Sequence, residues 1–528
     1  MHSLPVRNIQ EQQTEIAVDE SVDVPIVSDS GNRESSGTSN RRLARNTLWN
    51  LIGYVAPLAV AVVVVPLLIR HLGTAKYGIL TIAWSVVGYF GIFDMGLSNA
   101  LTKFIAERVG HHDEGEIKAI FQTGFLLLVA SSICAGIGLA FIARPLAYRW
   151  LNVPIELRPD AYRVFLIFAL VLPFVVSVAC FRGTLCAYQR FDLMNKVQII
   201  TGIFSFGSPA VMLLFSNGLV PIVAVIALCR VGSWLAYLYC CTLVLPSFDL
   251  AWHARRALVR PLITFGGWIS VCNVAEPVFL YSDRFILASL VSVSAVAYYA
   301  TPFDVIVRLW SIPDALNSAL FPLYASGLRN NTNRVLMLFE RAGHYIFPLT
   351  FAPVLFAVLF AHDLLSLWIS SAFAAHSAVV LQWLAVGVIF SSMARVPWTL
   401  LVAYRPDLPA KLVTFEAPVY VTALYFMISH YGLPGAAMAW TMRTAFNCSI
   451  LHVMTWLTLP GSARAAKKNC ALLMMAILVL SVAPFVPSGV AARGLYWAFA
   501  LAACYSVTWF FVMSAEERAE LNPALLMG

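Results

Sequence analysis

Long apolar runs recur along this chain of 528 residues, and they constrain its fold more than any other feature. Examples are YVAPLAVAVVVVPLLI at 54–69 and ALLMMAILVLSVAPFV at 471–486. A helix needs about 20 mostly apolar residues to cross the hydrocarbon core of a membrane, and each run reaches that length with its flanks. The composition agrees, because 60% of the residues are hydrophobic and only 12% are charged. Since a chain in hydrocarbon must satisfy its own backbone hydrogen bonds, the sequence predicts an all-α polytopic membrane protein.

Counting the apolar runs gives about 14 transmembrane helices. The loops between them are about 20 residues or shorter, which leaves no room for a globular catalytic domain. The expected spans are 47–70, 78–103, 119–143, 161–181, 196–216, 219–245, 262–290, 294–325, 341–361, 377–403, 409–430, 432–459, 469–487 and 493–513.

The expected domain organisation starts with an acidic, serine-rich segment at 1–40, whose composition predicts a disordered cytoplasmic tail. Residues 41–245 and 262–460 are expected to form two six-helix lobes, joined by a basic cytoplasmic linker at 246–261. Residues 461–528 are expected to add two further helices and a short cytoplasmic tail. Lys and Arg collect at the span ends on one side, which places both termini in the cytoplasm. The net charge of +8 is then mostly a topology signal, and no nucleic-acid partner is expected.

Weak internal similarity indicates that the two lobes are copies of one unit. Similar short segments recur at a nearly constant offset of about 220 residues. Because six helices return the chain to its starting side, the repeats are expected to be parallel, with a pseudo-two-fold axis along the membrane normal. This arrangement is typical of alternating-access transporters. The matching positions are Trp49 and Trp268, Pro57 and Pro277, Tyr77 and Tyr298, and Leu97 and Leu316.

No motif in the sequence predicts a cofactor, a metal or a catalytic residue. The ten cysteines form neither a CxxC pair nor a Cys/His metal spacing, so they are expected to be small buried hydrophobic residues. A phosphate-binding GxxxxGK[ST] loop is also absent from the sequence. We therefore expect a protein that is not an enzyme.

The first two spans carry a family resemblance, in PLLIRHLGTAKYGIL at 66–80 and GIFDMGLSNALTKFIAE at 91–107. These segments resemble the polysaccharide flippases of the multidrug/oligosaccharidyl-lipid/polysaccharide exporter superfamily. The likeness continues at 281–300, 318–328 and 431–447, although LVSVSAVAYY after the seventh span lacks the glycines that such proteins commonly carry there. The resemblance implies two six-helix lobes around a central cavity, with two further helices in many members.

The same resemblance implies a function. Such proteins move undecaprenyl-diphosphate-linked oligosaccharide from the inner to the outer leaflet of the inner (plasma) membrane, for polysaccharide and O-antigen biosynthesis. Expected partners are this substrate and membrane lipids, with a polysaccharide polymerase and other assembly proteins as further candidates. Two alternatives stay open: a cation-coupled multidrug exporter of the same superfamily, and an integral membrane polysaccharide polymerase or glycosyltransferase.

Polar residues inside the spans are the candidate cavity residues, because a lone charge at the bilayer centre costs about 2.5–3.5 kcal/mol on insertion scales. In the second span Asp94 and Asn99 share one helical face with Ser98 and Thr102. This face either lines a water-filled cavity or lets a neighbouring helix pack closely against small residues.

The second half has its own candidates, centred on Arg308. Asp304 lies four residues before it, and Glu276 and Asp283 share a face of the preceding span. Arg308 is either one half of a structural ion pair with Asp304 or Glu276, or its planar donors bind a diphosphate. Two further arginines inside spans complete the candidate cavity residues; they are Arg395 and Arg443.

Overall fold

The structure is a computed structural model that describes residues 35–94, 96–110, 113–245 and 254–521. Most of the predicted disordered tail, residues 1–34, lies outside the described residues, whereas Ser35 to Asn40 already belong to a helix. The chain divides into two compact units, Met1–Leu51 and Ile52–Gly528. The second unit contains all the candidate site residues.

The described residues of the first half form helices and no strand. These elements are α1 (Ser35–Phe90), η1 (Gly91–Asp94), α2 (Leu97–Gly110), α3 (Glu114–Pro145), η2 (Leu146–Trp150), η3 (Ile155–Leu157), α4 (Arg158–Ala187), α5 (Phe191–Leu213) and α6 (Leu219–Thr242).

The described part of the second half is helical as well. Its elements are α7 (Arg256–Leu290), α8 (Val293–Ile306), η4 (Val307–Trp310), α9 (Ser311–Asn330), α10 (Thr332–Leu359), α11 (Ala361–Trp368), α12 (Ser371–Tyr404), α13 (Asp407–Thr458), η5 (Pro460–Ser462), α14 (Ala463–Val482), η6 (Ala483–Phe485), α15 (Val490–Val507), η7 (Thr508–Val512) and α16 (Ala515–Leu521).

Ten helices of the described chain are long and apolar enough to cross a membrane, which confirms the predicted all-α polytopic architecture. Two of the helical elements are each two helices joined at a glycine. Gly73 interrupts α1 with a φ of 77°, and Gly432 interrupts α13 with a φ of 60°. Glycine adopts such positive φ angles without a Cβ clash. The count of about 14 spans stays a prediction.

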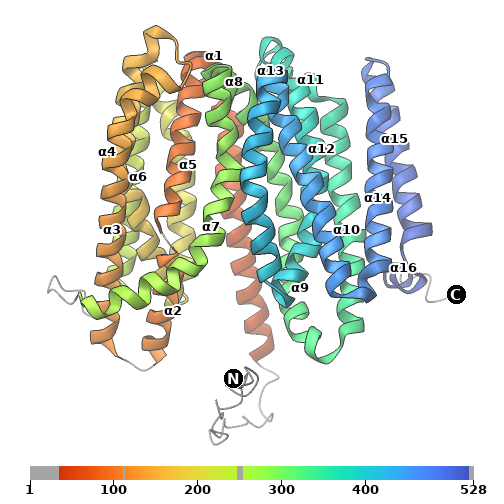
Figure 1. The fold of residues 1–528 in the computed structure, drawn as a ribbon, viewed down its shortest axis with the longest axis horizontal. Helices are drawn as coiled ribbons and strands as arrows, with labels where there is room; N and C mark the ends of the chain where they lie inside the picture. Colours follow the sequence, from red (N-terminus) through yellow and green to blue (C-terminus); the bar gives the residue numbers. More distant parts are fainter. Residues whose placement is uncertain (1–34, 95, 111–112, 246–253, 522–528) are drawn as a thin grey trace, which may run out of the picture. The chain divides into compact units, whose positions relative to one another are not determined.

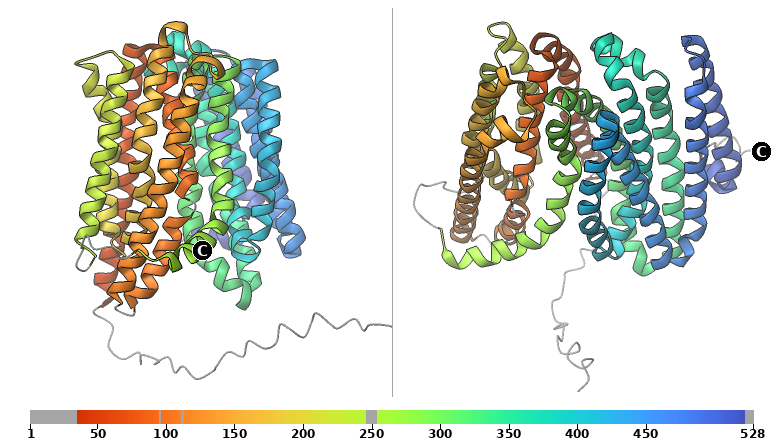
Figure 2. Two further views of the ribbon diagram at one scale, coloured as in Figure 1. Left: turned by 60° about the vertical axis from the view of Figure 1, so that its left-hand side comes forward. Right: turned by 45° about the horizontal axis from the view of Figure 1, so that its top comes forward.

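The helices of the second unit form two groups. Figure 1 shows α3 to α6 together on one side and α10 with α12 to α15 on the other, and the views of Figure 2 agree. The helix α7 starts beside the first group and bends toward the second. It begins at Arg256, inside the predicted linker at 246–261, of which residues 246–253 lie outside the described residues. The predicted lobe boundaries stay a prediction.

Both halves carry a four-residue tight turn shortly before the similar segments of the predicted repeat. The four-residue 3₁₀ turn η1 precedes α2, and the four-residue 3₁₀ turn η4 precedes α9. The similar segments LSNALTKF and LNSALFPL follow these turns. A 3₁₀ turn has three residues per turn instead of 3.6, so it rotates the side chains that follow it relative to a continuous α-helix.

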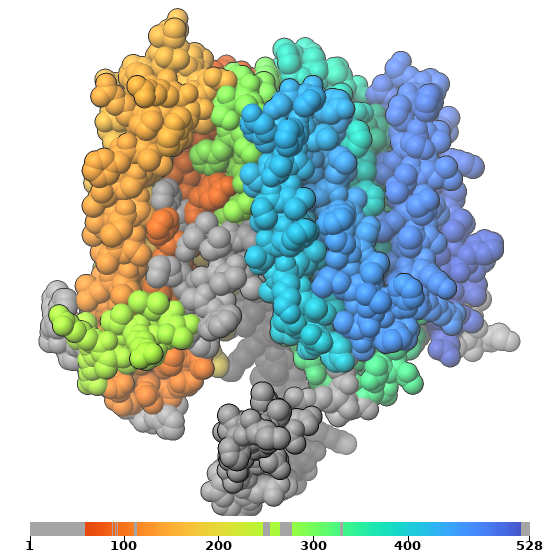
Figure 3. Space-filling model, in the orientation of Figure 1, coloured from red at the N-terminus to blue at the C-terminus, as the bar shows by residue number. Residues whose placement is uncertain are grey.

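The two halves are joined by hydrogen bonds at one end of the bundle, which we call the Gly73 end because α1 breaks there. The backbone N–H of Asn152 donates to the carbonyl of Ala288 at 2.8 Å, and its side-chain amide donates to the carbonyl of Ser289 at 2.7 Å. The guanidinium of Arg70 donates twice to the carbonyl of Ile369, at 3.0 and 2.8 Å. Figure 3 shows green atoms from the start of the second half between the two groups at this end, at the top of the view.

The surface around η4 and α9 is open. Arg308, Asp314 and Ser318 are exposed, as are most of the described residues of α9. Because charged side chains are costly in hydrocarbon, this surface must face water rather than lipid tails. The two halves are therefore in contact at the Gly73 end, and we expect water to reach the surface of η4 and α9.

The closure at the Gly73 end can be tested at Gly78, where α1 touches the backbone at the start of α8. A Cβ on Gly78 would overlap the carbonyl oxygen of Val293. We expect Gly78→Val to destabilise this closed state by about 1–3 kcal/mol, because the neighbour is backbone that cannot rotate away. Spin labels on α1 and α8 should report a longer distance by electron–electron double resonance. Gly138→Val is the matched control, because nothing lies within 4 Å of the added Cβ. An unchanged distance in the Gly78 variant would contradict this closure.

Candidate functional site

The centre of the charged site is the buried guanidinium of Arg284 on α7. Its Nη2 lies 2.6 Å from Oδ1 of Asp304 on α8, and its Nη1 donates to the hydroxyl of Ser85 on α1 at 3.1 Å. The rings of Tyr281 and Phe303 lie 5.4 and 5.9 Å from the guanidinium. The Arg284 side chain is 5% exposed, whereas that of Asp304 is 49% exposed. The ion pair therefore neutralises a buried cation with a carboxylate that also reaches open space.

Of the alternatives for Arg308, the ion pair with Asp304 does not form in the structure, because the partner of Asp304 is Arg284. The spacing of four residues assumes a continuous α-helix, but α8 ends at Ile306 and Arg308 lies in the tighter turn η4. Arg308 is exposed and forms no ion pair with an acid of the described residues; the side chain of Glu276 lies outside them.

Asp283, next to Arg284, is a fully buried carboxylate. Its Oδ1 accepts the backbone N–H of Arg284 at 2.7 Å. The buried hydroxyl of Tyr299 lies near enough to this carboxylate to act as a hydrogen-bond donor, and that of Tyr420 interacts with it electrostatically. An ionised carboxylate inside a membrane bundle is costly, and a bound proton or small cation would also compensate its charge.

Two residues of the polar face of the second span, Ser98 and Thr102, pack against α4. Asp94 ends η1, and its Oδ1 accepts the backbone N–H of Ser98 at 3.0 Å, which caps the start of α2. The hydroxyls of Ser98 and Thr102 each donate to a backbone carbonyl of α4 at 3.1 Å. The close-packing alternative therefore holds for these two residues. Asn99 is exposed, and a role in a cavity for it and for Asp94 stays a prediction.

Arg443 is neutralised within α13. Its Nη1 lies 3.4 Å from Oε1 of the buried Glu416, and the amide of Asn447 donates to the other oxygen of Glu416 at 2.7 Å. The guanidinium lies beside two neighbouring rings, 4.3 Å from that of Phe279 and 5.3 Å from that of Tyr420. Arg443 therefore holds the two helices of α13 together and docks α7 against them.

Arg395 on α12 forms an ion pair with Asp314 on α9. Its guanidinium lies 4.7 Å from the ring of Trp310, whose indole N–H donates to the hydroxyl of Ser391 at 2.8 Å. A pocket of about 300 Å³ opens beside this pair, between α9 and α12.

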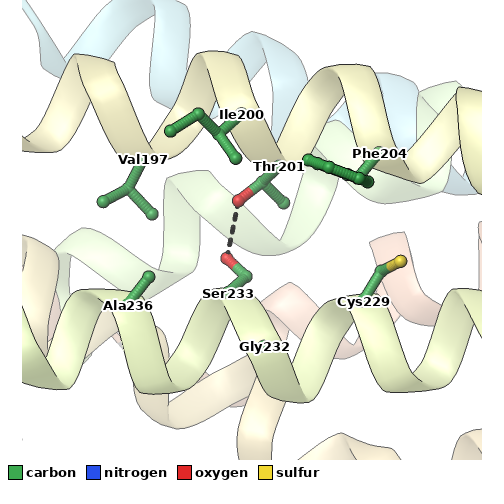
Figure 4. A pocket seen from close by; sticks show the side chains of 8 residues that line it. All are labelled: Val197, Ile200, Thr201, Phe204, Cys229, Gly232, Ser233 and Ala236. Atoms are coloured by element: carbon green, nitrogen blue, oxygen red, sulfur yellow. Dashed lines mark hydrogen bonds between the residues drawn. The ribbon is translucent and has the colours of Figure 1, made fainter.

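A smaller pocket, of about 180 Å³, lies between α5 and α6 and contains none of the candidate residues. Figure 4 shows its only drawn polar contact, the 2.9 Å hydrogen bond from the hydroxyl of Thr201 to that of Ser233. Its other lining residues are apolar or small, and exposed Phe204 opens it toward lipid. We interpret it as a gap between apolar helices rather than a site.

The structure therefore brings three charged groups together, Asp283, Arg284 and Asp304, of which the sequence singled out only the two acids. A sequence signal for Arg284 does exist. It lies inside the mostly apolar segment VFLYSDRFILASL at 278–290, six residues before the end of α7, where a charge is unusual. Asp314 was missed as well, and nothing in the sequence shows that it lies opposite Arg395.

The ion pair of Arg284 predicts an unequal cost for its two partners. Asp304→Asn should be the more destabilising, by about 3–5 kcal/mol, because it leaves a buried guanidinium without a counter-ion. Arg284→Met should cost less, because half-exposed Asp304 can be solvated, and the double variant should recover most of the thermal stability. Thermal unfolding of the purified protein in detergent measures all three. Asp407→Asn is the control, since its pair with Arg405 is on the surface and worth at most about 1 kcal/mol. Equal costs for the two single variants would refute this order.

Comparison with solved structures shows the same fold in transporters of very different sequence. One is described as the inward-facing conformation of a multidrug resistance MATE family transporter of the MOP superfamily; it is 13% identical, with a TM-score of 0.64 over 80% of this chain and 98% of that one. Another is the lipid II flippase MurJ in an inward closed conformation, 11% identical, with a TM-score of 0.62 over 88% of this chain and 99% of that one.

Sequence comparison gives relatives over most of the chain. A protein of Shigella flexneri named "Putative O-antigen transporter" is 29% identical over 417 residues, which are 78% of this chain and 97% of that protein. The "Uncharacterized membrane protein EpsK" of Bacillus subtilis (strain 168) is 22% identical over 410 residues, which are 74% of this chain and 78% of that protein. The family described as "Polysaccharide biosynthesis protein" matches residues 43–327, and the chain belongs to this family of multi-pass membrane proteins.

Proposed function

We propose that this protein is a flippase that moves undecaprenyl-diphosphate-linked oligosaccharide from the inner to the outer leaflet of the inner membrane, by alternating access. Membership of a polysaccharide biosynthesis family supports this proposal, as does the relative named as an O-antigen transporter, which the match covers over 97% of its length. The fold shared with a lipid II flippase supports it at the level of architecture. The sugar chain would then be delivered to a polysaccharide polymerase and other assembly proteins.

The observation that carries the proposal is the state of Arg308. Asp304, one of its two candidate partners, is held by Arg284, so it does not neutralise Arg308, which lies exposed on η4 beside α9. A guanidinium presents planar paired donors that match phosphate oxygens, and charge-assisted hydrogen bonds of this kind are the strong ones. Arg308 would bind the diphosphate of the substrate.

The orientation follows from the distribution of positive charge. With Lys and Arg enriched at the cytoplasmic ends, both termini face the cytoplasm and the closed Gly73 end faces outward. The described state would then be the loading state, in which the substrate enters from the inner leaflet. Opening the Gly73 end would release it outward.

A cation-coupled multidrug exporter is the second candidate, because Asp283 is a fully buried carboxylate that could take up a coupling ion. A proton or cation at Asp283 would serve equally well to couple a flippase. An exposed cation such as Arg308, which no acid of the described residues neutralises, disfavours a cationic drug as substrate. Export of a cationic dye by proteoliposomes, with no flipping of lipid-linked oligosaccharide, would favour the exporter.

Arg308→Ala should lower the flipping rate of undecaprenyl-diphosphate-linked oligosaccharide in proteoliposomes by about 10-fold or more, which corresponds to a lost charge-assisted interaction. Arg308→Lys should restore the rate only partly, because an ammonium group lacks the paired donors. Both variants should insert and unfold at the wild-type temperature, since Arg308 neutralises no acid of the described residues.

The matched control is Arg334→Ala, which removes another exposed arginine, on α10. It should flip at the wild-type rate. Wild-type flipping by Arg308→Ala would remove Arg308 from substrate binding, and a lowered unfolding temperature in that variant would show a structural role instead.

Membrane potential should accelerate transport. A substrate with about two negative charges that leaves an inside-negative compartment gains about 2.3 kcal/mol per charge per 100 mV. Flipping in proteoliposomes should therefore become faster when a potassium gradient with valinomycin makes the interior negative and the donor leaflet is the inner one. A rate that ignores both this potential and imposed proton or sodium gradients would contradict electrically driven export.

A further inference from the structure

The pocket between α9 and α12 is separate from Arg308 and carries its own set of polar groups. Its volume of about 300 Å³ lies at the lower limit of small-molecule sites, which span about 300–1,000 Å³. The lining residues that bear on its chemistry are Asp314, Asn317 and Ser318 of α9, and Arg395, Trp398 and Thr399 of α12.

Asn317 is the unusual member of this set. It is 7% exposed, and neither its amide nitrogen nor its amide oxygen has a hydrogen-bond partner among the described residues. A buried amide offers two donors and two acceptor positions, and leaving such a group unpaired costs about 1–3 kcal/mol. The uncompensated amide on the wall of a pocket indicates that a ligand or water completes its hydrogen bonds.

The charges around Asn317 exclude a phosphate group as the preferred occupant. Arg395 is already paired with Asp314, so the pocket has no free cation to offer, and the Asp314 carboxylate would repel an anion. The hydroxyls of Ser318 and Thr399 donate to carbonyls of their own helices, at 2.8 and 2.9 Å, which leaves them as acceptors. A ligand with several neutral hydroxyls, each able to donate and accept, fits these groups.

The remaining wall is apolar and aromatic. Trp398 lines the pocket, and Trp310 lies behind Arg395 on the side of α9. Sugars combine ring hydroxyls with an apolar C–H face, which matches an amide beside an indole. Because the amide atoms of Asn317 are covered in this state, a sugar must first displace a neighbouring side chain. The partly exposed pair of Asp314 and Arg395 can rearrange at low cost, since such pairs contribute at most about 1 kcal/mol.

We infer that the pocket between α9 and α12 is a sugar subsite, in which Asn317 hydrogen-bonds hydroxyls of a saccharide unit while Trp398 covers its apolar face. The inference rests on the proposed function, because the saccharide would be the head group of the lipid-linked substrate. Arg308 would then bind the diphosphate and Asn317 would select the sugar.

The test compares two probes on the full-length protein in nanodiscs: undecaprenyl diphosphate without sugar, and undecaprenyl-diphosphate-linked oligosaccharide. Asn317→Leu should weaken binding of the sugar-bearing lipid by about 10-fold and leave binding of the sugar-free lipid unchanged. Its unfolding temperature should stay at or above that of the wild type, because the change removes an unsatisfied amide at similar volume. Arg308→Ala should weaken binding of both lipids.

Asn469→Leu is the matched control, since Asn469 is a fully buried asparagine on α14 with an unpartnered amide oxygen, outside the pocket. It should leave both affinities unchanged. Asn317→Leu that binds the sugar-bearing lipid like the wild type would overturn the subsite, and so would a marked loss of stability, which would show a structural role of the amide. A wild-type protein that binds neither lipid would instead overturn the proposed function.

Discussion

The buried guanidinium of Arg284 sets the conditions for the rest of the charged site. A cation that is 5% exposed inside a membrane bundle needs a counter-ion, and Asp304 supplies it at 2.6 Å. Because Arg284 also donates to Ser85 on α1, the same group joins the two halves of the protein near their closed end. Asp304 is then no longer available to Arg308. Arg284 thus joins α1 to α7 through Ser85, and it holds the carboxylate of Asp304 away from Arg308, which no acid of the described residues neutralises.

The other candidate arginines differ from Arg308 in this respect. Arg443 is paired with Glu416 and lies beside two aromatic rings, and Arg395 is paired with Asp314. An arginine that is paired with a carboxylate holds helices together, but the carboxylate beside it would repel a diphosphate. Partners therefore distinguish the arginines, and this distinction separates Arg308, the proposed ligand of the diphosphate, from the proposed sugar subsite at Asn317.

The sequence was sufficient for the architecture, because apolar runs of about 20 residues and their polar interruptions depend on local composition alone. It also identified Asp283, Asp304 and Arg308 as unusual. The sequence did not show which residues these side chains contact. The four-residue spacing of Asp304 and Arg308 predicts a contact only in a continuous α-helix, and the 3₁₀ turn η4 interrupts the helix there. The pairs of Arg284 with Ser85 and of Arg395 with Asp314 join residues about 200 and 80 positions apart, so they depend on helix packing that no local pattern encodes.

The most direct test of the central claim is an experimental structure of the protein in nanodiscs with undecaprenyl diphosphate bound. The account predicts phosphate oxygens within about 3 Å of the guanidinium of Arg308, while Asp304 stays on Arg284 and the Gly73 end stays closed. A structure in which the diphosphate binds elsewhere, and Arg308 is paired with an acidic side chain of the protein, would contradict it.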